Sequence, residues 1–326
     1  MDFRPVRNLT VLVLAVVATS AVTPAARAAY PGHNGRLAFV RGHDIYTVRP
    51  DGGSLVRLTA SGKNYRPRWS PDGTRIAYVH EASPTSRDIW VMNADGTGKS
   101  RVTRLGSVTG PAWSPGGQRL AFGGLGPCTV GGPARCRLDV QTVRSTAPYG
   151  TPTVLFGRYC GPTGCDGTGE EVIVGDVLGP PAWSPDGTRI TFGTRDFPDS
   201  ADRYVVDYGL ATRHVTVVDM VGGSCCGEGR LTAPQYGPDG TRLTVTSTRY
   251  CPECDEHPPP STTYTERGPA VPTTAHDSDA AFSPDGRQIA VTNDAAGTAS
   301  VFTQPVGGGA RTRVAQGRQP DWQPRP

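Results

Sequence analysis

Short stretches in which apolar and polar positions alternate recur along the chain and predict β-strands. The clearest of them, residues 75–79 with the sequence Arg-Ile-Ala-Tyr-Val, follows Trp69 and the four residues Ser-Pro-Asp-Gly. In that four-residue sequence Pro71 restricts φ and Gly73 is free to adopt a positive φ, as a tight turn requires. The pattern therefore predicts a hairpin in which Trp69 ends one strand and residues 75–79 form the next.

The chain after this hairpin predicts two more strands, at residues 88–93 and 100–105, with a turn at residues 94–98 between them. Four antiparallel strands in a unit of roughly 40 residues are typical of a β-propeller blade. An aromatic residue, a proline or alanine two positions before it, a glycine turn and an apolar stretch recur together in five copies, at residues 68–78, 112–122, 182–192, 235–245 and 281–291. This repeat predicts one repetitive domain where the chain length alone would suggest two.

The two ends of the repeat region complete a sixth blade. Residues 35–40 match the back half of the unit and have no aromatic strand before them, whereas residues 319–322 match the front half and have no strand after them. If the strand with Trp322 pairs with the strand that contains Leu37, no sheet edge is left free at the seam. The expected fold is all-β: a six-bladed β-propeller of four-stranded antiparallel blades, with the ring closed by the C-terminal strand joining the first blade.

Residues 1–28 have the features of a secretory signal peptide. Arg4 and Arg7 precede an apolar stretch at positions 9–22, and Ala28 ends a small-residue cleavage sequence. The alternative is an uncleaved membrane anchor, although the apolar stretch is short for a bilayer. Cleavage would leave a propeller of residues 29–326 with no membrane insertion. It would also lower the formal net charge from +4 to +2, because three arginines and one aspartate are removed, and dispersed charge of this size does not indicate nucleic-acid binding.

Residues 69–77, Trp-Ser-Pro-Asp-Gly-Thr-Arg-Ile-Ala, and residues 88–98, Asp-Ile-Trp-Val-Met-Asn-Ala-Asp-Gly-Thr-Gly, resemble the repeat of the TolB-like, WD40-like PD40 β-propeller family. The resemblance implies the propeller fold over the region from residue 29 onward. It implies function only broadly, since such repeats occur in scaffolds of the Tol–Pal system, in propellers that gate prolyl-oligopeptidase-type peptidases and in other secreted proteins. We expect the propeller without the N-terminal domain of TolB, and residues 222–226 lack the last glycine of the Gly-x-Ser-x-Gly motif of hydrolases.

The longest connections between the expected strands lie on one face of the ring. In an antiparallel meander the second-to-third loops and the crossings between blades share one face, opposite the Pro-Asp-Gly turns. The long connections of blades 3 to 5 are of this kind, at residues 125–136, 158–179, 196–202, 219–232 and 249–262. Their candidate binding residues are the carboxylates Asp166, Glu170, Asp196, Asp202, Glu228 and Asp255. Loops on a rigid scaffold commonly hold binding sites, so we expect a ligand here; the alternative is neutral insertions pinned by disulfides.

A second group of candidates lies at the expected central channel or at its mouth. Two arginines precede the aromatic residue of blade 2, and carboxylates occupy similar positions in blades 6 and 1. Their opposite charges would orient a peptide. The alternative is that these side chains are simply solvated in a water-filled channel. The candidates are Arg66, Arg68, His276, Asp277, Asp279 and Asp321.

All eight cysteines fall in the long connections, and in a secreted chain they predict disulfides. Cys128 and Cys136 flank one loop and are expected to pair with each other. Cys160 and Cys165 flank another and are expected to do the same.

The other four cysteines, Cys225, Cys226, Cys251 and Cys254, belong to two segments on the same face of blade 5. We expect them to pair between the segments, in an order that the sequence does not define. The alternative is a zinc site that adds His257 to these thiolates. We expect no metal, because structural zinc sites usually contain two Cys-x-x-Cys pairs and an oxidising compartment favours disulfides.

The sequence favours a secreted, non-catalytic binding or scaffold protein that engages an extracellular or cell-envelope protein or peptide through the acidic, cysteine-rich loops of blades 3 to 5. The alternative is an extracellular hydrolase or lyase with a site in the funnel of the same face, since a fold does not exclude catalysis. Catalysis would need converging histidines, carboxylates or a metal, and the six histidines are scattered. We expect no cofactor and a monomer.

The disulfide interpretation makes a prediction for the purified secreted protein. Denatured without reductant, it should show no free thiols by thiol titration and no stoichiometric zinc by elemental analysis. One equivalent of zinc together with four free thiols would contradict the pairing expected for the four cysteines near blade 5.

Overall fold

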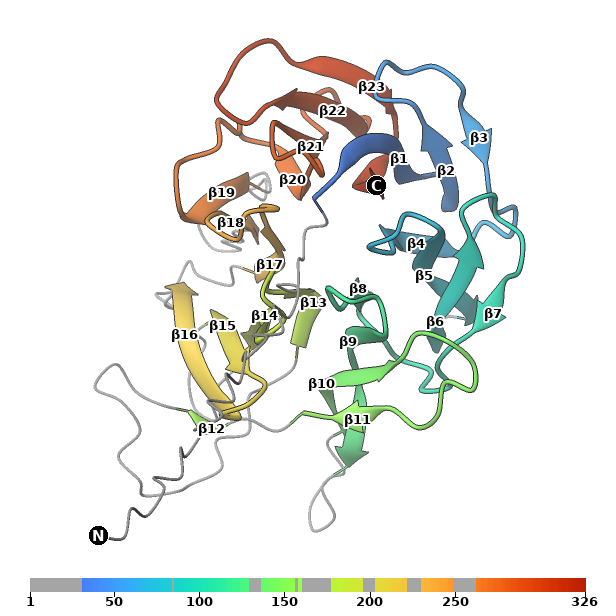
Figure 1. Ribbon diagram of the computed structural model, residues 1–326, viewed down its shortest axis with the longest axis vertical. Helices are drawn as coiled ribbons and strands as arrows, with labels where there is room; N and C mark the ends of the chain where they lie inside the picture. Colours follow the sequence, from blue (N-terminus) through green and yellow to red (C-terminus); the bar gives the residue numbers. More distant parts are fainter. Residues whose placement is uncertain are drawn as a thin grey trace, which may run out of the picture.

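The computed structural model describes residues 31–83, 85–128, 136–155, 158–159, 177–195, 203–221, 230–248 and 262–326. Their strands form six sheets arranged as blades around a ring, which confirms the six-bladed β-propeller predicted from the repeat (Figure 1). The predicted signal peptide lies outside the described residues. Within the described residues, no helix has the length and hydrophobicity needed to cross a membrane.

The blades follow one another along the chain, and blades 2 to 6 each begin with the inner strand at the channel. In blade 1 the inner strand is the last strand of the chain. Blade 1 contains β24 (Arg318–Arg325), β1 (His33–Arg41), β2 (Asp44–Val48) and β3 (Val56–Arg57). Blade 2 contains β4 (Asn64–Trp69), β5 (Arg75–Ser83), β6 (Ser86–Asn93) and β7 (Ser100–Arg101). Blade 3 contains β8 (Ala112–Trp113), β9 (Arg119–Cys128), β10 (Cys136–Arg144) and β11 (Thr153–Val154).

The second half of the ring departs more from the simple repeat. Blade 4 contains β13 (Val177–Trp183), β14 (Arg189–Arg195), β15 (Arg203–Gly209) and β16 (His214–Val221), and β12 (Arg158–Tyr159) adds to it in parallel. Blade 5 contains β17 (Arg230–Tyr236), β18 (Leu243–Thr248) and β19 (Thr262–Arg267). Blade 6 contains β20 (Asp277–Phe282), β21 (Gln288–Asn293), β22 (Ser300–Pro305) and β23 (Thr312–Gln316).

Blade 5 has three regular strands within the described residues. The segment after β19 makes a single bridge to it, between Thr262 and Ala275. Pro269 and Pro272 lie in this segment, and proline has no amide hydrogen to donate to a strand ladder. The segment therefore runs beside β19 without becoming a regular fourth strand.

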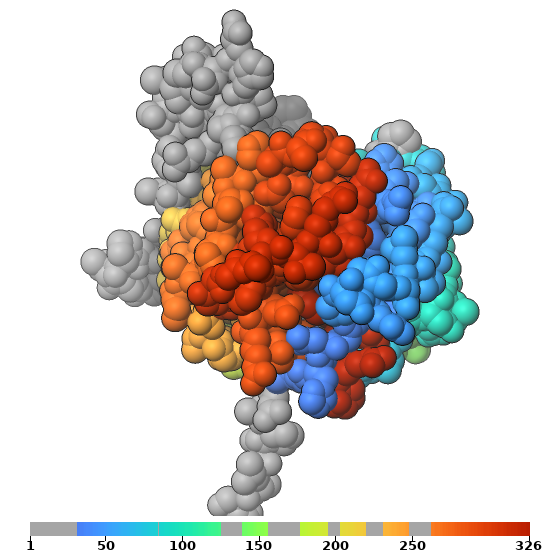
Figure 2. All heavy atoms as spheres, turned by 90° about the horizontal axis from the view of Figure 1, so that it is seen from above, coloured from blue at the N-terminus to red at the C-terminus, as the bar shows by residue number. Residues whose placement is uncertain are grey.

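The ring closes through antiparallel pairing of β24 with β1, in a register that places Trp322 opposite Leu37. This confirms the predicted seam between the C-terminal strand and the first blade. Figure 2 shows the blue N-terminal and red C-terminal segments side by side at the closure. The C-terminal strand is thus the inner strand of blade 1, and the seam leaves neither β1 nor β24 as a free edge.

The apolar core lies between blades, because alternating side chains leave each sheet on both faces. Leu37 and Phe39 of β1 pack in one cluster with residues of blade 6, whereas Ala38 packs in another with Trp69 and Ile76 of blade 2. Similar clusters join blade 2 to blade 3 and blade 3 to blade 4. Each blade is therefore stabilised mainly by its neighbours.

The Pro-Asp-Gly turns are held by a repeated set of hydrogen bonds. Ser70 donates its hydroxyl to Asp72 (2.6 Å) and accepts the amide of Arg75 (2.9 Å), while the amide of Thr74 donates to Asp72 (3.0 Å). Burial alone would raise the pKa of the Asp72 carboxyl, but these hydrogen bonds hold it below its ordinary value. The aspartates at this position are therefore turn residues, as the sequence indicated.

The crossing from blade 2 to blade 3 depends on a buried carboxylate that the sequence analysis did not single out. Asp88, at the start of β6, accepts hydrogen bonds from Arg101 (2.6 Å), from the hydroxyl of Thr103 (2.7 Å) and from the amide of Leu105 (2.8 Å). These contacts replace ladder hydrogen bonds, so the expected strand 100–105 is regular only at Ser100 and Arg101. Asp44 holds the crossing from blade 1 in the same way, through Arg57 and Thr59.

Replacing Asp88 should therefore destabilise the propeller. Asp88→Ala leaves the partly exposed Arg101 guanidinium, the buried hydroxyl of Thr103 and the amide of Leu105 without their acceptor. The loss should be about 1–3 kcal/mol, the cost of leaving a buried hydrogen-bond donor unsatisfied. Chemical denaturation measures this loss. Asp95→Ala, in an exposed turn of the same blade, is the matched control and should have a much smaller effect; equal effects would contradict the role of Asp88.

Candidate functional site

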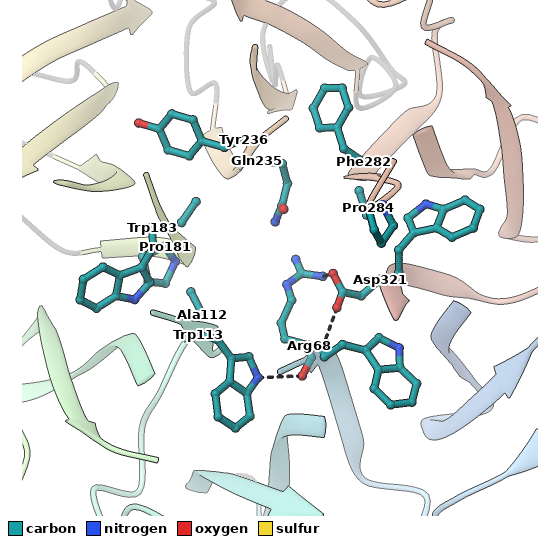
Figure 3. Close-up of a pocket in the computed structure, with 14 residues that line it drawn as sticks. Arg68, Ala112, Trp113, Pro181, Trp183, Gln235, Tyr236, Phe282, Pro284 and Asp321 are labelled. Carbon is teal, nitrogen blue, oxygen red and sulfur yellow. Dashed lines mark hydrogen bonds and ion pairs between the residues drawn. The ribbon is translucent and has the colours of Figure 1, made fainter. Parts of the chain in front are cut away.

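The central channel is lined by one residue from each inner strand, the one just before the aromatic residue (Figure 3). Three of these residues are alanine and three have long or charged polar side chains. In ring order from blade 1 they are Asp321, Arg68, Ala112, Ala182, Gln235 and Ala281. With the flanking aromatic residues they enclose a cavity of about 80 Å³, so the channel is narrow at this level.

Arg68 and Asp321 meet across the boundary between blades 2 and 1. The guanidinium lies 3.6 Å from the carboxylate, with side chains only 9% and 16% exposed. The amide of Trp69 also donates to Asp321 (2.7 Å), and the indole of Trp113 donates to the carbonyl of Arg68 (2.9 Å; Figure 3). The structure thus brings together two residues that the sequence analysis proposed for the channel, and it fixes both through the backbone of blade 2.

The Asp321 carboxyl is electrostatically unusual. Burial raises its pKa to about 6, and neither Arg68 nor the amide of Trp69, both of which favour the charged form, offsets that effect. Groups with strongly shifted pKa values are frequent at functional sites, although structural ion-pair networks also shift pKa values.

Closer to the loops, the inner strands of blades 1, 2, 4, 5 and 6 contain a bulge that the sequence analysis missed. In four of these strands the residue three positions before the aromatic has a positive φ although it is not glycine, at Arg66 (53°), Ala233 (50°), Asp279 (50°) and Gln319 (57°). Each bulge coincides with a register shift in the strand pairing. Such backbone strain persists only where the surroundings enforce it.

Side chains of the preceding blade enforce three of these bulges. The amide of Arg66 donates to the side chain of Gln319 (2.9 Å), and the amide of Gln319 donates to Thr292 (2.9 Å). The amide of Asp279 donates to Thr246 (3.3 Å). The bulges therefore place Arg66 and Asp279 at fixed positions in the upper channel.

Arg66 and Asp279 are close enough to influence each other. Burial lowers the pKa of the Arg66 guanidinium, the Asp279 carboxylate opposes this effect, and Arg68 adds to it. The channel thus has two levels of opposite charge: Arg66 with Asp279 nearer the loops, and Arg68 with Asp321 below them. The sequence analysis proposed these four residues for the channel or its mouth, and their role in binding stays a prediction.

The two other candidates at the mouth have different environments. Asp277 is fully buried and accepts hydrogen bonds from Thr274, Asn293 (2.8 Å) and Arg311 (2.8 Å), so its carboxylate holds the crossing into blade 6. His276 is exposed and lies 3.1 Å from Asp294. Of the pair, only His276 is placed to meet a ligand.

The loop candidates are largely beyond the described residues. These are Asp166, Glu170, Asp196, Asp202, Glu228 and Asp255, with Cys160, Cys165, Cys225, Cys226, Cys251, Cys254 and His257. Cys128 and Cys136 end β9 and begin β10, and the register pairs them directly. Their predicted disulfide stays a prediction. Among the described residues, no group of three His, Cys, Asp or Glu side chains is arranged to hold a metal ion.

Comparison with known proteins supports the fold. No protein-family model matches the chain, and no curated protein does so either. Among solved structures, TolB from Acinetobacter baumannii is similar with a TM-score of 0.64 and 16% identity, over 89% of this chain and 67% of that one. A hydrazine synthase chain from Kuenenia stuttgartiensis is similar with a TM-score of 0.59 and 12% identity, over 90% of this chain and 47% of that one. A chain of a nidogen/laminin complex is similar with a TM-score of 0.57 and 8% identity, over 88% of this chain and 98% of that one.

These similarities establish the β-propeller fold, and membership of the TolB-like PD40 family stays a prediction. At such low identities they extend to the fold and not to any site. The channel residues of this chain therefore have to be tested directly.

The Arg68–Asp321 contact predicts a measurable titration. In Arg68→Gln the pKa of Asp321 should rise above about 6, because the group that opposes the effect of burial is lost. Carboxyl NMR titration measures this, and Arg66→Gln is the matched control that should change it less. An unchanged pKa in Arg68→Gln would contradict the contact.

The same carboxyl predicts the sign of a pH effect on stability. Since its pKa is higher in the folded protein than in the unfolded chain, the folded state binds the extra proton between about pH 4 and pH 6. The stability contribution of Asp321 is therefore fully present below pH 4 and is lost as the pH rises through 6. Denaturation of wild type against Asp321→Asn across this range should show wild type losing stability relative to the variant; the opposite slope would contradict the raised pKa.

Proposed function

We propose that this chain is a secreted or cell-envelope binding protein that engages a protein or peptide through one face of the propeller. We call this the loop face: it contains the second-to-third connections of the blades, the crossings between blades and the upper mouth of the channel. The fold and the TolB-like neighbours support a binding or scaffold role in general terms. The predicted signal peptide and cysteines support a location outside the cytoplasm.

The observation that supports the proposal best is convergence on this face. The long second-to-third connections start and end at described strand ends, namely Cys128 and Cys136 in blade 3, Arg195 and Arg203 in blade 4, and Thr248 and Thr262 in blade 5. The inner strands also begin at this face. The level of the channel that contains Arg66 and Asp279 therefore lies directly beneath it. The described ends of these connections and the mouth with Arg66 and Asp279 thus lie on the same face, which supports a single binding surface.

The charges of the mouth suit a peptide. A peptide segment offers carbonyl oxygens, amide hydrogens and side chains of both signs, and Arg66 and Asp279 present a cation and an anion at fixed positions. The bulges preorganise both residues, which lowers the entropic cost of binding. The narrow level at Arg68 and Asp321 then limits how far a chain can enter.

The proposal is tested by ligand capture with immobilised full-length protein. Residues 129–135, 196–202 and 249–261 are each replaced by a short Asn-Gly turn, which joins the strand ends described above. The matched control replaces residues 295–299 in the second-to-third connection of blade 6 on the same face and keeps Asp294, the partner of His276. Ligands captured from culture medium are identified by mass spectrometry, and their affinities are then measured by calorimetry.

The loop replacements of blades 3 to 5 should weaken binding of the identified ligand at least about tenfold, whereas the blade 6 control should retain it. Arg66→Gln with Asp279→Asn should weaken binding as well. If the protein in which all three loops are replaced retains its affinity for the ligand, the loop face is not the binding surface. Chemical turnover of the captured ligand would favour the hydrolase or lyase alternative.

A further inference from the structure

The boundary between blades 4 and 5 differs chemically from the other boundaries. Two small apolar clusters join these blades, one around Tyr236 and Leu243 and the other around Leu231 and Val245, whereas larger single clusters join blades 1 to 4. Polar side chains from both blades contact one another at the same boundary: Arg189, Thr191, Asp207, Tyr236 and Arg267.

Strand register shows which of these residues depart from the repeat. The position of Thr191 is alanine in blades 1, 2, 3 and 6 and threonine in blade 5, whereas the position of Asp207 is threonine in blades 1, 3, 5 and 6. Asp207 is therefore the clearest departure. In blades 1 and 3 the arginine after the turn donates to that threonine, as Arg36 does to Thr47 (3.0 Å). In blade 4 a carboxylate takes the place of the hydroxyl.

Asp207 recruits a second arginine from the next blade. Its Oδ2 atom lies 3.4 Å from Arg189 and 3.3 Å from Arg267, and the hydroxyls of Thr191 and Tyr236 contact Oδ1. One carboxylate thus faces two guanidinium groups, which leaves one positive charge uncompensated within the cluster. Apart from the buried Nε of Arg189 and the bond of Arg267 to Tyr236, it leaves further N–H donors of the two arginines for another acceptor.

The two guanidinium groups border a cavity of about 730 Å³ on the flank of the ring. The Asp207 side chain is only 8% exposed, whereas those of Arg189 and Arg267 are 40% and 37% exposed, so the cations and not the anion face the open space. The remaining wall is formed mainly by β16 and the turn before it, with hydroxyls at Thr188, Thr212 and Thr216, the imidazole of His214, and apolar Val217 and Val218. Blade 5 has no regular outer strand among the described residues to cover this flank (Figure 1).

We propose that this cavity binds a small organic oxyanion, a polar compound such as a sugar with a phosphate, sulfate or carboxylate group. Two forked guanidinium groups match the oxygens of such a group and bind it by charge-assisted hydrogen bonds. The threonine hydroxyls and the apolar wall suit the rest of a molecule of one or two rings, since cavities of several hundred Å³ hold ligands of that size. The site is separate from the channel and from the loop face.

The test uses full-length protein and four probes measured by calorimetry: glucose 6-phosphate, inorganic phosphate, glucuronate and, as the neutral comparison, glucose. At least one of the three anions should bind, and glucose should bind at least about tenfold more weakly than that anion. Tighter binding of glucose 6-phosphate or glucuronate than of inorganic phosphate identifies an organic anion as the ligand. Equal binding of inorganic phosphate supports an oxyanion site with free phosphate as its source.

Three variants locate the site. Arg267→Gln should weaken binding of the anion at least about tenfold. Thr216 lies directly opposite Asp207 in the pairing of β15 with β16, so Thr216→Glu adds a carboxylate beside the two arginines and should do the same by occupying them. It keeps the test valid if Arg267→Gln unfolds. Arg242→Gln, which removes the arginine at the position of Arg189 in blade 5 and lies outside the cavity lining, should bind within about twofold of wild type.

Three outcomes would overturn the proposal: no anion binds, glucose binds as well as the anions, or Thr216→Glu retains wild-type affinity. Thermal unfolding without ligand accompanies each variant, and only folded variants are compared. Because the loop face plays no part in this site, the loop replacements of blades 3 to 5 can fail in ligand capture without affecting anion binding.

Discussion

Burial on both faces of every blade is the constraint on which the rest of the structure depends. The alternating side chains of each inner and second strand pack against two neighbours, so no blade can cover its apolar surface alone. The ring must therefore close, and the pairing of β24 with β1 supplies the last boundary through Leu37 and Trp322. The buried carboxylates Asp44, Asp88 and Asp277 then hold the crossings that connect one blade to the next.

The features that were predictable from the sequence are those with local causes. Ser-Pro-Asp-Gly defines its turn within four residues, so its recurrence revealed the blades, and the half units at the ends revealed the seam. The charges at Arg68 and Asp321 were predictable as channel residues because their place before the aromatic residue repeats. The carboxylate of Asp277, two residues from Asp279, was interpreted as a mouth residue, yet it is buried because Arg311, distant in the sequence, pairs with it.

What the sequence did not reveal depends on contacts between blades. The positive φ of Arg66 is not marked by a glycine; it is enforced by the side chain of Gln319 in another blade. In the same way, the sequence around Asp207 does not indicate a charged site, because Arg267, which pairs with it, belongs to the next blade. The repeat thus specifies the ring, and the residues that break it at the channel and at the boundary of blades 4 and 5 are those for which we propose ligand binding.

Hydrogen exchange of backbone amides tests the closure most directly. If the ring is one cooperative unit, the amides of Leu37 and Val40 in β1 should exchange with the same free energy of opening as the amides of Leu120 and Phe122 in blade 3, because all of them become exposed only on global unfolding. Exchange at Leu37 and Val40 by a separate opening of lower free energy would show that the seam breaks alone, and it would contradict the closed ring as the constraint that holds the blades together.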